Sequence, residues 1–339
     1  MKDMLKYTGT LMGCAIGDAL GRPVEGFMKE QISKYVGRVD SFIDTPVIED
    51  TDGNRPTSDE YGKIPGDWWS LKKGQYTDDT ILTLAIAESI VREKCINLAD
   101  IAKSQADAYF HYDDKGENRG FGGSTRRALT KIREGVSHEN SAGEPGTGNG
   151  PIMKTAPFGI YMDLTDDYKG GIEAALKTAE MTHGDENAVW GAALQTHLVY
   201  KLIRNEIKGR DEFLDDAYHA FLLDSRGSVL EEKMNWILEN PDTSVTEGLE
   251  HLGNSCAACE SFPFTLFMFQ KYWDNSYEGL LETINCGGDC DTTGAMYGAL
   301  LGARDGFRAF PVDLIKEVED SQRIFDIGIG LRRLEDELR

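Results

Sequence analysis

The sequence lacks several features that define whole classes of protein. No apolar run approaches the ~20 residues that a membrane-spanning helix requires. Leu11-Met12-Gly13-Cys14 faintly resembles a lipoprotein cleavage site, but the apolar stretch before it is too short and Asp3 stands where positive charge is expected. We therefore read residues 1–19 as a helix of the mature protein, and we expect a cytoplasmic protein without membrane contact.

Basic residues are also scarce. Lys and Arg number 36 against 58 Asp and Glu, which gives a formal net charge of −22. A chain this acidic is a poor candidate for non-specific binding to nucleic acid or to anionic membranes. A small phosphorylated substrate is still compatible, because one bound metal ion can reverse the local potential.

Cysteines are few, and we expect them to be reduced. The pairs Cys256/Cys259 and Cys286/Cys290 have spacings that could hold zinc, so a zinc protein is one alternative. However, Cys256 and Cys259 open an apolar stretch, residues 262–269, that is typical of a buried helix. Free cysteine is common in cores, so we favour the interpretation of these residues as core.

Strand signals are weak, whereas helical periodicity covers most of the chain. We therefore predict an all-α fold in one domain, residues 1–339, because no change in composition marks a linker. Two long segments, 35–76 (with Trp68-Trp69 near its end) and 112–155, are rich in glycine and polar residues and are predicted to contain functional loops. The predicted helices after the first span residues 80–93, 97–111, 124–134, 171–182, 186–207, 211–223, 228–238, 257–272, 276–285, 291–304 and 319–338.

Two predicted helices repeat glycine at every fourth position. One has Gly13, Gly17 and Gly21, and the other has the same spacing in the range 294–302. Each helical glycine costs about 1 kcal/mol relative to alanine, so a stripe of them needs a compensating benefit. Missing side chains let two backbones approach closely, and we expect these helices to cross in the middle of the protein. The charge at Asp18 disfavours the alternative, a dimer motif in a membrane.

Two acidic clusters stand at predicted helix starts. They are Thr77-Asp78-Asp79 and Asp289-Cys290-Asp291-Thr292, the second following a Gly-Gly pair. Each could be a helix cap, because Asp and Thr accept hydrogen bonds from the first turn. Two caps do not need four carboxylates, however. Four carboxylates with threonine hydroxyls suit a pair of Mg²⁺ or Mn²⁺ ions, if the clusters meet in space.

These motifs together resemble the ADP-ribosylglycohydrolase family, the group of the dinitrogenase reductase-activating glycohydrolases. The likeness covers about residues 7–305. It rests on GCAIGDALGRPVE (13–25), YTDDT (76–80), GNGPIMKTAPFGI (148–160), Thr182-His183, SFPFTLFMF (261–269) and GGDCDTTGAMYGALLGA (287–303).

The resemblance implies an orthogonal helical bundle that hydrolyses ADP-ribose conjugates with two divalent cations, Mg²⁺ or Mn²⁺. It implies catalytic roles for Glu25, Asp78 and Asp291. The implied metal ligands are Thr77, Asp78, Asp79, Asp289, Asp291 and Thr292. The implied substrate-binding residues are Asn118, Gly120, Gly122, Gly123, Ser124, Gly148, Asn149, Gly150, Met153 and His183.

The sequence departs from the family pattern at three places. Cys290 replaces a threonine at a position to which we assign no ligand role. Lys154 stands where arginine is frequent, which exchanges a forked donor for a point charge. His183 lies in an unusual context, and a histidine at a helix end is often structural.

Three other functions fit parts of the pattern. A phosphoesterase with a binuclear metal site would use the same ligands. A non-catalytic ADP-ribose-binding or structural homologue would share the fold, although the metal carboxylates are all present here. The zinc protein is the third. The predicted reaction is the attack of water on the anomeric carbon, with Glu25 or metal coordination removing its proton.

Overall fold

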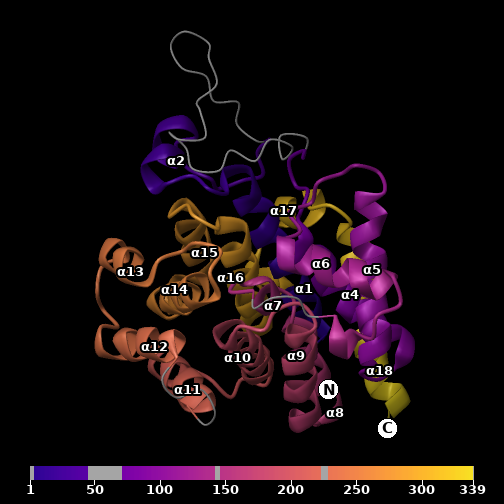
Figure 1. Ribbon diagram of the computed structural model, residues 1–339. Coiled ribbons are helices and arrows are strands. Elements are labelled where there is room, and N and C mark those ends of the chain that lie inside the picture. The colour runs from indigo at the N-terminus through magenta and orange to yellow at the C-terminus, as the bar shows by residue number, and fades with distance from the viewer. Residues whose placement is uncertain (1–3, 45–70, 142–145, 223–227, 339) are drawn as a thin grey trace.

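The computed structural model describes residues 4–44, 71–141, 146–222 and 228–338, and within these ranges it contains helices and no strand (Figure 1). The all-α prediction is confirmed. Two isolated bridges join Met28 to Gly287 and Gly148 to Ala257. The α-helices are α1 (Met4–Gly21), α2 (Lys29–Tyr35), α4 (Asp78–Glu93), α5 (Leu98–Asp113), α6 (Gly123–Arg133), α7 (Gly150–Met153), α8 (Ala156–Thr165), α9 (Tyr168–Glu180), α10 (Glu186–Ile203), α11 (Arg210–Leu222), α12 (Val229–Glu239), α13 (Val245–Leu252), α14 (Ala258–Lys271), α15 (Ser276–Asn285), α16 (Cys290–Asp305), α17 (Val312–Glu317) and α18 (Ser321–Leu338).

No helix is predicted from the sequence at α2, α7, α8, α13 or α17. Helix α13 nevertheless has a capping box, in which Ser244 and Glu247 bond each other's backbone N–H groups. Of the two predicted loop segments, residues 45–70, with Trp68 and Trp69, and residues 142–145 lie outside the described residues. The described part of 112–155 includes α6 and the short helix α7. None of the described helices has the length and apolar character that crossing a membrane would need.

Helices α1 and α16 form the centre of the fold and run antiparallel in close contact. A Cβ atom added to Gly17 would lie 1.9 Å from the carbonyl oxygen of Gly294, and one added to Gly13 would lie 2.0 Å from that of Gly298. The same meeting occurs at Gly9 with Gly302. The predicted close approach is confirmed, but the two helices do not simply cross: their backbones touch from one end of the pair to the other.

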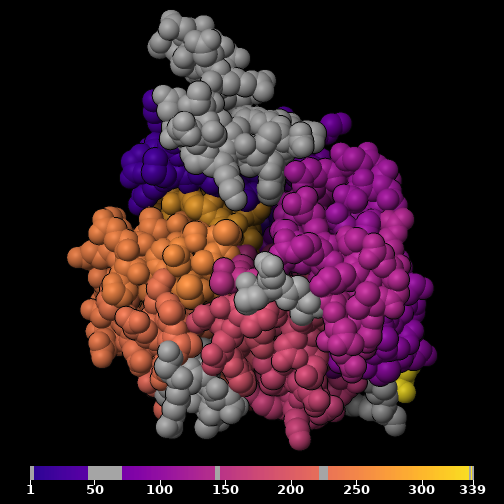
Figure 2. Space-filling model, viewed as in Figure 1, coloured from indigo at the N-terminus to yellow at the C-terminus, as the bar shows by residue number. Residues whose placement is uncertain are grey.

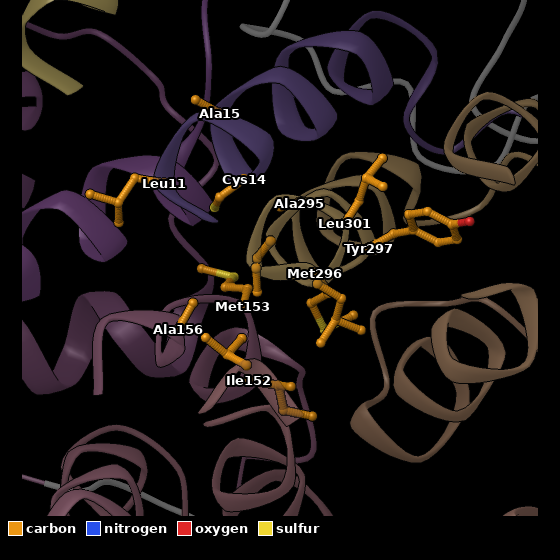
Figure 3. Packing of buried hydrophobic residues seen from close by; sticks show 14 of the residues in the cluster. Leu11, Cys14, Ala15, Ile152, Met153, Ala156, Ala295, Met296, Tyr297 and Leu301 are labelled. Carbon is orange, nitrogen blue, oxygen red and sulfur yellow. The ribbon is translucent and has the colours of Figure 1, made fainter. Parts of the chain in front are cut away.

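We call the row of contacts between α1 and α16 the glycine seam; it is made by Gly9, Gly13, Gly17, Gly294, Gly298 and Gly302. Buried apolar side chains surround it. Figure 3 shows Cys14 of α1, Met153 of α7 and Ala295 of α16 converging in the core, and all three are at most 3% exposed. Helix α10 packs on α7, α8, α9 and α16, while α4 packs between α1, α5 and α18 (Figure 1). The seam therefore holds the starts of α4 and α16 within one core.

Helix α14 is buried along residues 261–270, as its apolar sequence predicts. The core interpretation holds for Cys286 and Cys290, which are buried, but it is wrong for the other pair. Cys256 is exposed and Cys259 is half-buried. The reason is that α14 begins only at Ala258, so both residues lie at its solvent-facing start.

Candidate active site

A cavity of about 380 Å³ lies where α4, α6, α7 and α16 begin. Figure 2 shows the face of the molecule on which the magenta surface of α5 and α6 lies on one side and the orange surface of α12–α14 lies on the other. Most predicted site residues line this cavity: Glu25, Asp78, Asp79, Gly120, Gly122, Gly123, Ser124, Gly148, Asn149, Gly150, Met153, His183, Asp289, Asp291 and Thr292. Thr125, Gly146, Thr147 and Cys256 also line it and were not predicted.

Two predicted residues do not line the cavity. Thr77 is fully buried behind it. The side-chain oxygen of Asn118 accepts a hydrogen bond from the Gly120 backbone N–H at 3.1 Å, which bends the loop that precedes α6. Both residues therefore lie next to lining residues and shape their positions.

The first turn of α4 is capped by a residue of another helix. Thr77 occupies the cap position without making a side-chain cap bond. Instead Asp18 of α1, which is fully buried, accepts hydrogen bonds from the backbone N–H groups of Thr77 and Thr80 at 3.0 and 3.1 Å and from both hydroxyls. Because Asp18 does the capping, Asp78 and Asp79 are not needed for it and face the cavity.

Asp18 is the main site residue that the sequence interpretation missed. The available signal was a charged residue within an otherwise apolar, glycine-rich helix, although the sequence does not show which groups it contacts. Its carboxylate needs buried donors, and the start of α4 supplies them. Burial first, and then the neighbouring Asp291, raises its pKa to about 7.

The start of α16 has a different support. Gly287 and Gly288 both have positive φ, 75° and 71°, which lets the chain turn sharply into the helix. The Asp289 N–H donates to the carbonyl of Asn254 at 2.8 Å, and the Asn149 amide donates to the Asp289 carboxylate. Asp289, like Thr77, makes no side-chain cap bond. Neither acidic cluster is therefore explained by capping.

Glu25 reaches the same cluster from the turn after α1. One carboxylate oxygen from each of Glu25, Asp289 and Asp291 lies within 4.8 Å of the others, close enough to share one metal ion. Arg22 forms a salt bridge with Glu25 at 3.2 Å. Two backbone bonds fix the turn: Gly26 donates to Gly288, and Gly288 donates to Phe27, both at 2.8 Å.

Electrostatics indicate that a cation fits this cluster. Burial raises the pKa of Asp78, Asp79 and Asp289 well above the usual range, and repulsion from neighbouring carboxylates adds to the effect. Asp79 has one buried carboxylate oxygen without a hydrogen-bond partner. Carboxylate and hydroxyl oxygens are the ligands that Mg²⁺ and Mn²⁺ prefer, so the donor set matches such ions.

His183 is both buried and at the cavity wall. Its Nδ1 lies 2.9 Å from the Thr182 hydroxyl, and the Lys154 ammonium donates to the same hydroxyl at 3.4 Å. Burial, with the charges of Lys154 and Arg127, lowers the pKa of His183 to about 3, so the ring is neutral. Burial likewise lowers the pKa of Lys154 to about 7, against the attraction of Asp78.

Glycines line the rest of the cavity, and we call them the glycine wall: Gly120, Gly122, Gly123, Gly146, Gly148 and Gly150. A Cβ atom on Gly146 would lie 2.6 Å from the Ser124 hydroxyl, and one on Gly150 would lie 3.1 Å from the His183 ring. Helix α6 starts at this wall, and its cap residue Gly122 provides no side chain to bond the first N–H groups. Open backbone N–H groups at a helix start favour an anionic group such as a pyrophosphate.

Comparisons with known proteins identify relatives that match nearly the whole chain. A sequence model of the ADP-ribosylglycohydrolase family matches residues 2–338. An uncharacterized protein of Archaeoglobus fulgidus is 27% identical over 97% of this chain and 96% of its own. The ADP-ribosylhydrolase ARH3 of Homo sapiens is 25% identical over 98% of this chain and 94% of its own. A solved structure titled "ADP-ribosylglycohydrolase-related protein complex" superposes with a TM-score of 0.66 at 25% identity, covering 98% of both chains.

Proposed function

Because this chain belongs to the ADP-ribosylglycohydrolase family, we propose that it hydrolyses the glycosidic bond between ADP-ribose and an attached group and releases ADP-ribose. The attached group is a protein side chain or the remainder of a small conjugate. One observation supports this proposal most: two acidic clusters and Glu25 face the same cavity as a glycine-lined helix start. The first can hold metal ions, and the second can hold a pyrophosphate.

We propose that Thr77, Asp78, Asp79, Asp289, Asp291 and Thr292 hold two divalent cations, Mg²⁺ or Mn²⁺. Such ions supply fixed positive charge that binds ribose hydroxyls and stabilises developing negative charge on oxygen. Asp18 accepts a hydrogen bond from the Thr77 hydroxyl, which leaves the lone pairs of the Thr77 oxygen for a metal. Asn149 orients Asp289 in the same way through its amide.

Glu25 is the residue that we propose to take the proton of the attacking water. Burial, with repulsion from Asp291, raises its pKa well above the usual range, which makes its carboxylate a stronger base. Arg22, 3.2 Å away, favours the ionised form that can accept the proton. The water oxygen then bonds to the anomeric carbon as the bond from that carbon to the attached group breaks. The leaving atom takes a proton from solvent, and Glu25 releases the proton of the attacking water to solvent, which restores its carboxylate.

ADP-ribose would lie along the glycine wall. The backbone N–H groups of Gly122, Gly123 and Ser124, at the start of α6, and of Gly148 and Gly150 are proposed to bind its pyrophosphate. His183 is neutral at physiological pH and can offer one ring nitrogen to the substrate without adding charge. We propose that residues 1–339 act as one domain in this function, and that the location is cytoplasmic.

A hydrolysis panel tests the proposal. ADP-ribose conjugates of arginine, serine and small acyl groups are incubated with Mg²⁺, Mn²⁺ or a chelator, and free ADP-ribose is quantified by chromatography. Asp291→Ala should abolish turnover, while Asp313→Ala, which removes an exposed carboxylate on α17, should not change it. Full turnover of Asp291→Ala with excess Mg²⁺ would contradict the metal assignment.

Glu25→Gln separates binding from chemistry. This variant should bind ADP-ribose about as tightly as the parent and lose at least about 100-fold in rate, which is the size of a general-base contribution. A parental rate would remove Glu25 from the mechanism. Release of inorganic phosphate in place of ADP-ribose would favour the phosphoesterase, and binding without any turnover would favour the non-catalytic homologue.

A further inference from the structure

Helix α6 has an unusual charge for this protein. The segment 118–133, which contains it, has no Asp or Glu but has five basic residues, in a chain whose net charge is −22. Arg126 and Arg127 are the fourth and fifth residues of α6, so the helix dipole, which favours cations in the last turn, gives them no stabilisation. Local stability therefore does not explain why they are there.

Two of these cations have no carboxylate partner in the described part of the chain. Arg133 pairs with Asp114 at 3.2 Å, and Arg119 pairs with Glu319 at 2.8 Å. No carboxylate of the described residues lies within ion-pair distance of Arg126 or Arg127. The Arg127 side chain reaches only the Ser124 hydroxyl, at 3.3 Å.

Arg126 and Arg127 border an open pocket of about 450 Å³. Tyr109, Thr130 and Lys131 also line it, and Gly123 lines both this pocket and the candidate active-site cavity. The two pockets therefore adjoin at Gly123. The lining of the pocket thus combines three basic side chains with the aromatic residue Tyr109.

We propose that this α6 pocket binds a phosphate group that the substrate carries beyond the ADP-ribose unit. The inference rests on the proposed function, since that function places ADP-ribose in the adjoining cavity. Arginine guanidinium groups bind phosphate oxygens through paired N–H donors. The phosphate comes either from a phosphate ester on the adenosine ribose or from the pyrophosphate of a second ADP-ribose unit.

Binding measurements distinguish these sources. Isothermal titration calorimetry is run with ADP-ribose, with ADP-ribose 2′-phosphate and with a dimer of ADP-ribose, the last on Glu25→Gln to prevent cleavage. At low salt, at least one phosphate-bearing probe should bind about 5- to 10-fold more tightly than ADP-ribose, the size of one or two exposed ion pairs. The probe that shows the gain identifies the source.

Variants locate the effect on α6. The quantity compared is the dissociation constant of ADP-ribose divided by that of the phosphate-bearing probe. This ratio should fall to about 1 in the double variant Arg126→Gln/Arg127→Gln, and it should stay above 1 in Arg126→Lys. Arg133→Gln is the matched control: it removes a cation from the same helix outside the pocket and should keep the parental ratio. Removing positive charge near the start of α6 should not unfold it, which circular dichroism checks.

Two results would overturn the inference. One is a ratio of about 1 for both probes in the parent, and the other is an equal loss of the ratio in Arg133→Gln. Absence of binding by ADP-ribose itself would instead refute the proposed function, and this inference with it. A gain that disappears at high salt supports the inference, because exposed ion pairs are screened.

Discussion

The starts of α4 and α16 have similar sequences but different supports. At α4, a single buried carboxylate, Asp18 of α1, satisfies the backbone and both threonine hydroxyls. At α16, neutral groups from two loops, Asn149 and Asn254, hold Asp289. Both helix starts adjoin the glycine seam, but only the α16 cluster is also bonded by segments that line the cavity.

Because of this difference, we expect the two clusters to respond differently to mutation and to ligand binding. A change in the substrate loop at Asn149 reaches the α16 cluster directly, because the Asn149 amide donates to Asp289. The α4 cluster has no such link to Asn149, and its support comes from within the glycine seam. We expect mutations on the α4 side to affect folding and metal binding together, and those on the α16 side to affect metal binding mainly.

The largest effect should come from the seam that both clusters share. Gly17→Ala places a Cβ atom 1.9 Å from the Gly294 carbonyl oxygen, and two helix backbones must separate to admit it. We expect a loss of about 4 kcal/mol or more in the free energy of unfolding, measured by urea denaturation. Gly209→Ala, where a Cβ atom meets nothing within 4 Å, should cost less than about 1 kcal/mol. Equal costs would contradict the seam.

Asp18→Ala should break the α4 side alone. It removes the cap of α4 and leaves buried hydroxyls without an acceptor, so we expect a loss of about 2 kcal/mol in stability. Affinity for Mn²⁺, measured by calorimetry, should fall at least about 10-fold, because Thr77 is no longer oriented. An unchanged affinity would show that Thr77 is not a ligand.

The stability of the metal-free protein should fall as pH rises, and divalent cations should oppose that fall. The raised pKa values mean that the folded, metal-free protein holds protons that the unfolded chain releases above about pH 4. Its stability should therefore fall as pH rises from 4 to about 7, by about 1.4 kcal/mol per pH unit for each carboxyl that stays protonated only in the folded state. Divalent cations replace these protons, so the gain in melting temperature from Mg²⁺ or Mn²⁺ should be larger at pH 8 than at pH 5. A constant gain would argue against ions in the cluster.

Asn149→Ala tests the α16 side. The variant removes the amide that orients Asp289, and we expect about a 10-fold loss in cation affinity. The free energy of unfolding should change much less than in Asp18→Ala, because Asn149 does not cap a long helix. A stability loss as large as that of Asp18→Ala would remove the contrast between the two clusters.

Cys290→Ser should have the smallest effect. The Cys290 thiol donates to the Gly21 carbonyl at 3.3 Å and lies in the seam. A serine hydroxyl can make the same bond, so we expect a stability change within about 1 kcal/mol and cation affinity within about threefold. A collapse of affinity would indicate a thiolate ligand and would favour the zinc alternative.

Much of this arrangement could be predicted from local sequence. Glycines at every fourth position predict the α1–α16 contact, because only close backbones compensate their cost. The role of Asp18 could not be predicted, since its donors come from a loop about sixty residues away. Short helices such as α17 carry too few residues for a periodic pattern. The exposure of Cys256 depends on where α14 begins, and helix boundaries are weakly encoded in sequence.

The glycine seam also determines when the site can form during folding. The Cys290 thiol bonds a carbonyl 269 residues earlier in the chain, so the central contact joins segments that are far apart in sequence. Contacts of such separation form slowly, because closing the intervening loop costs entropy before the contact compensates it. During synthesis, the glycine face of α1 therefore stays exposed until α16 has been made. An early segment of the chain therefore cannot assemble the acidic pocket on its own.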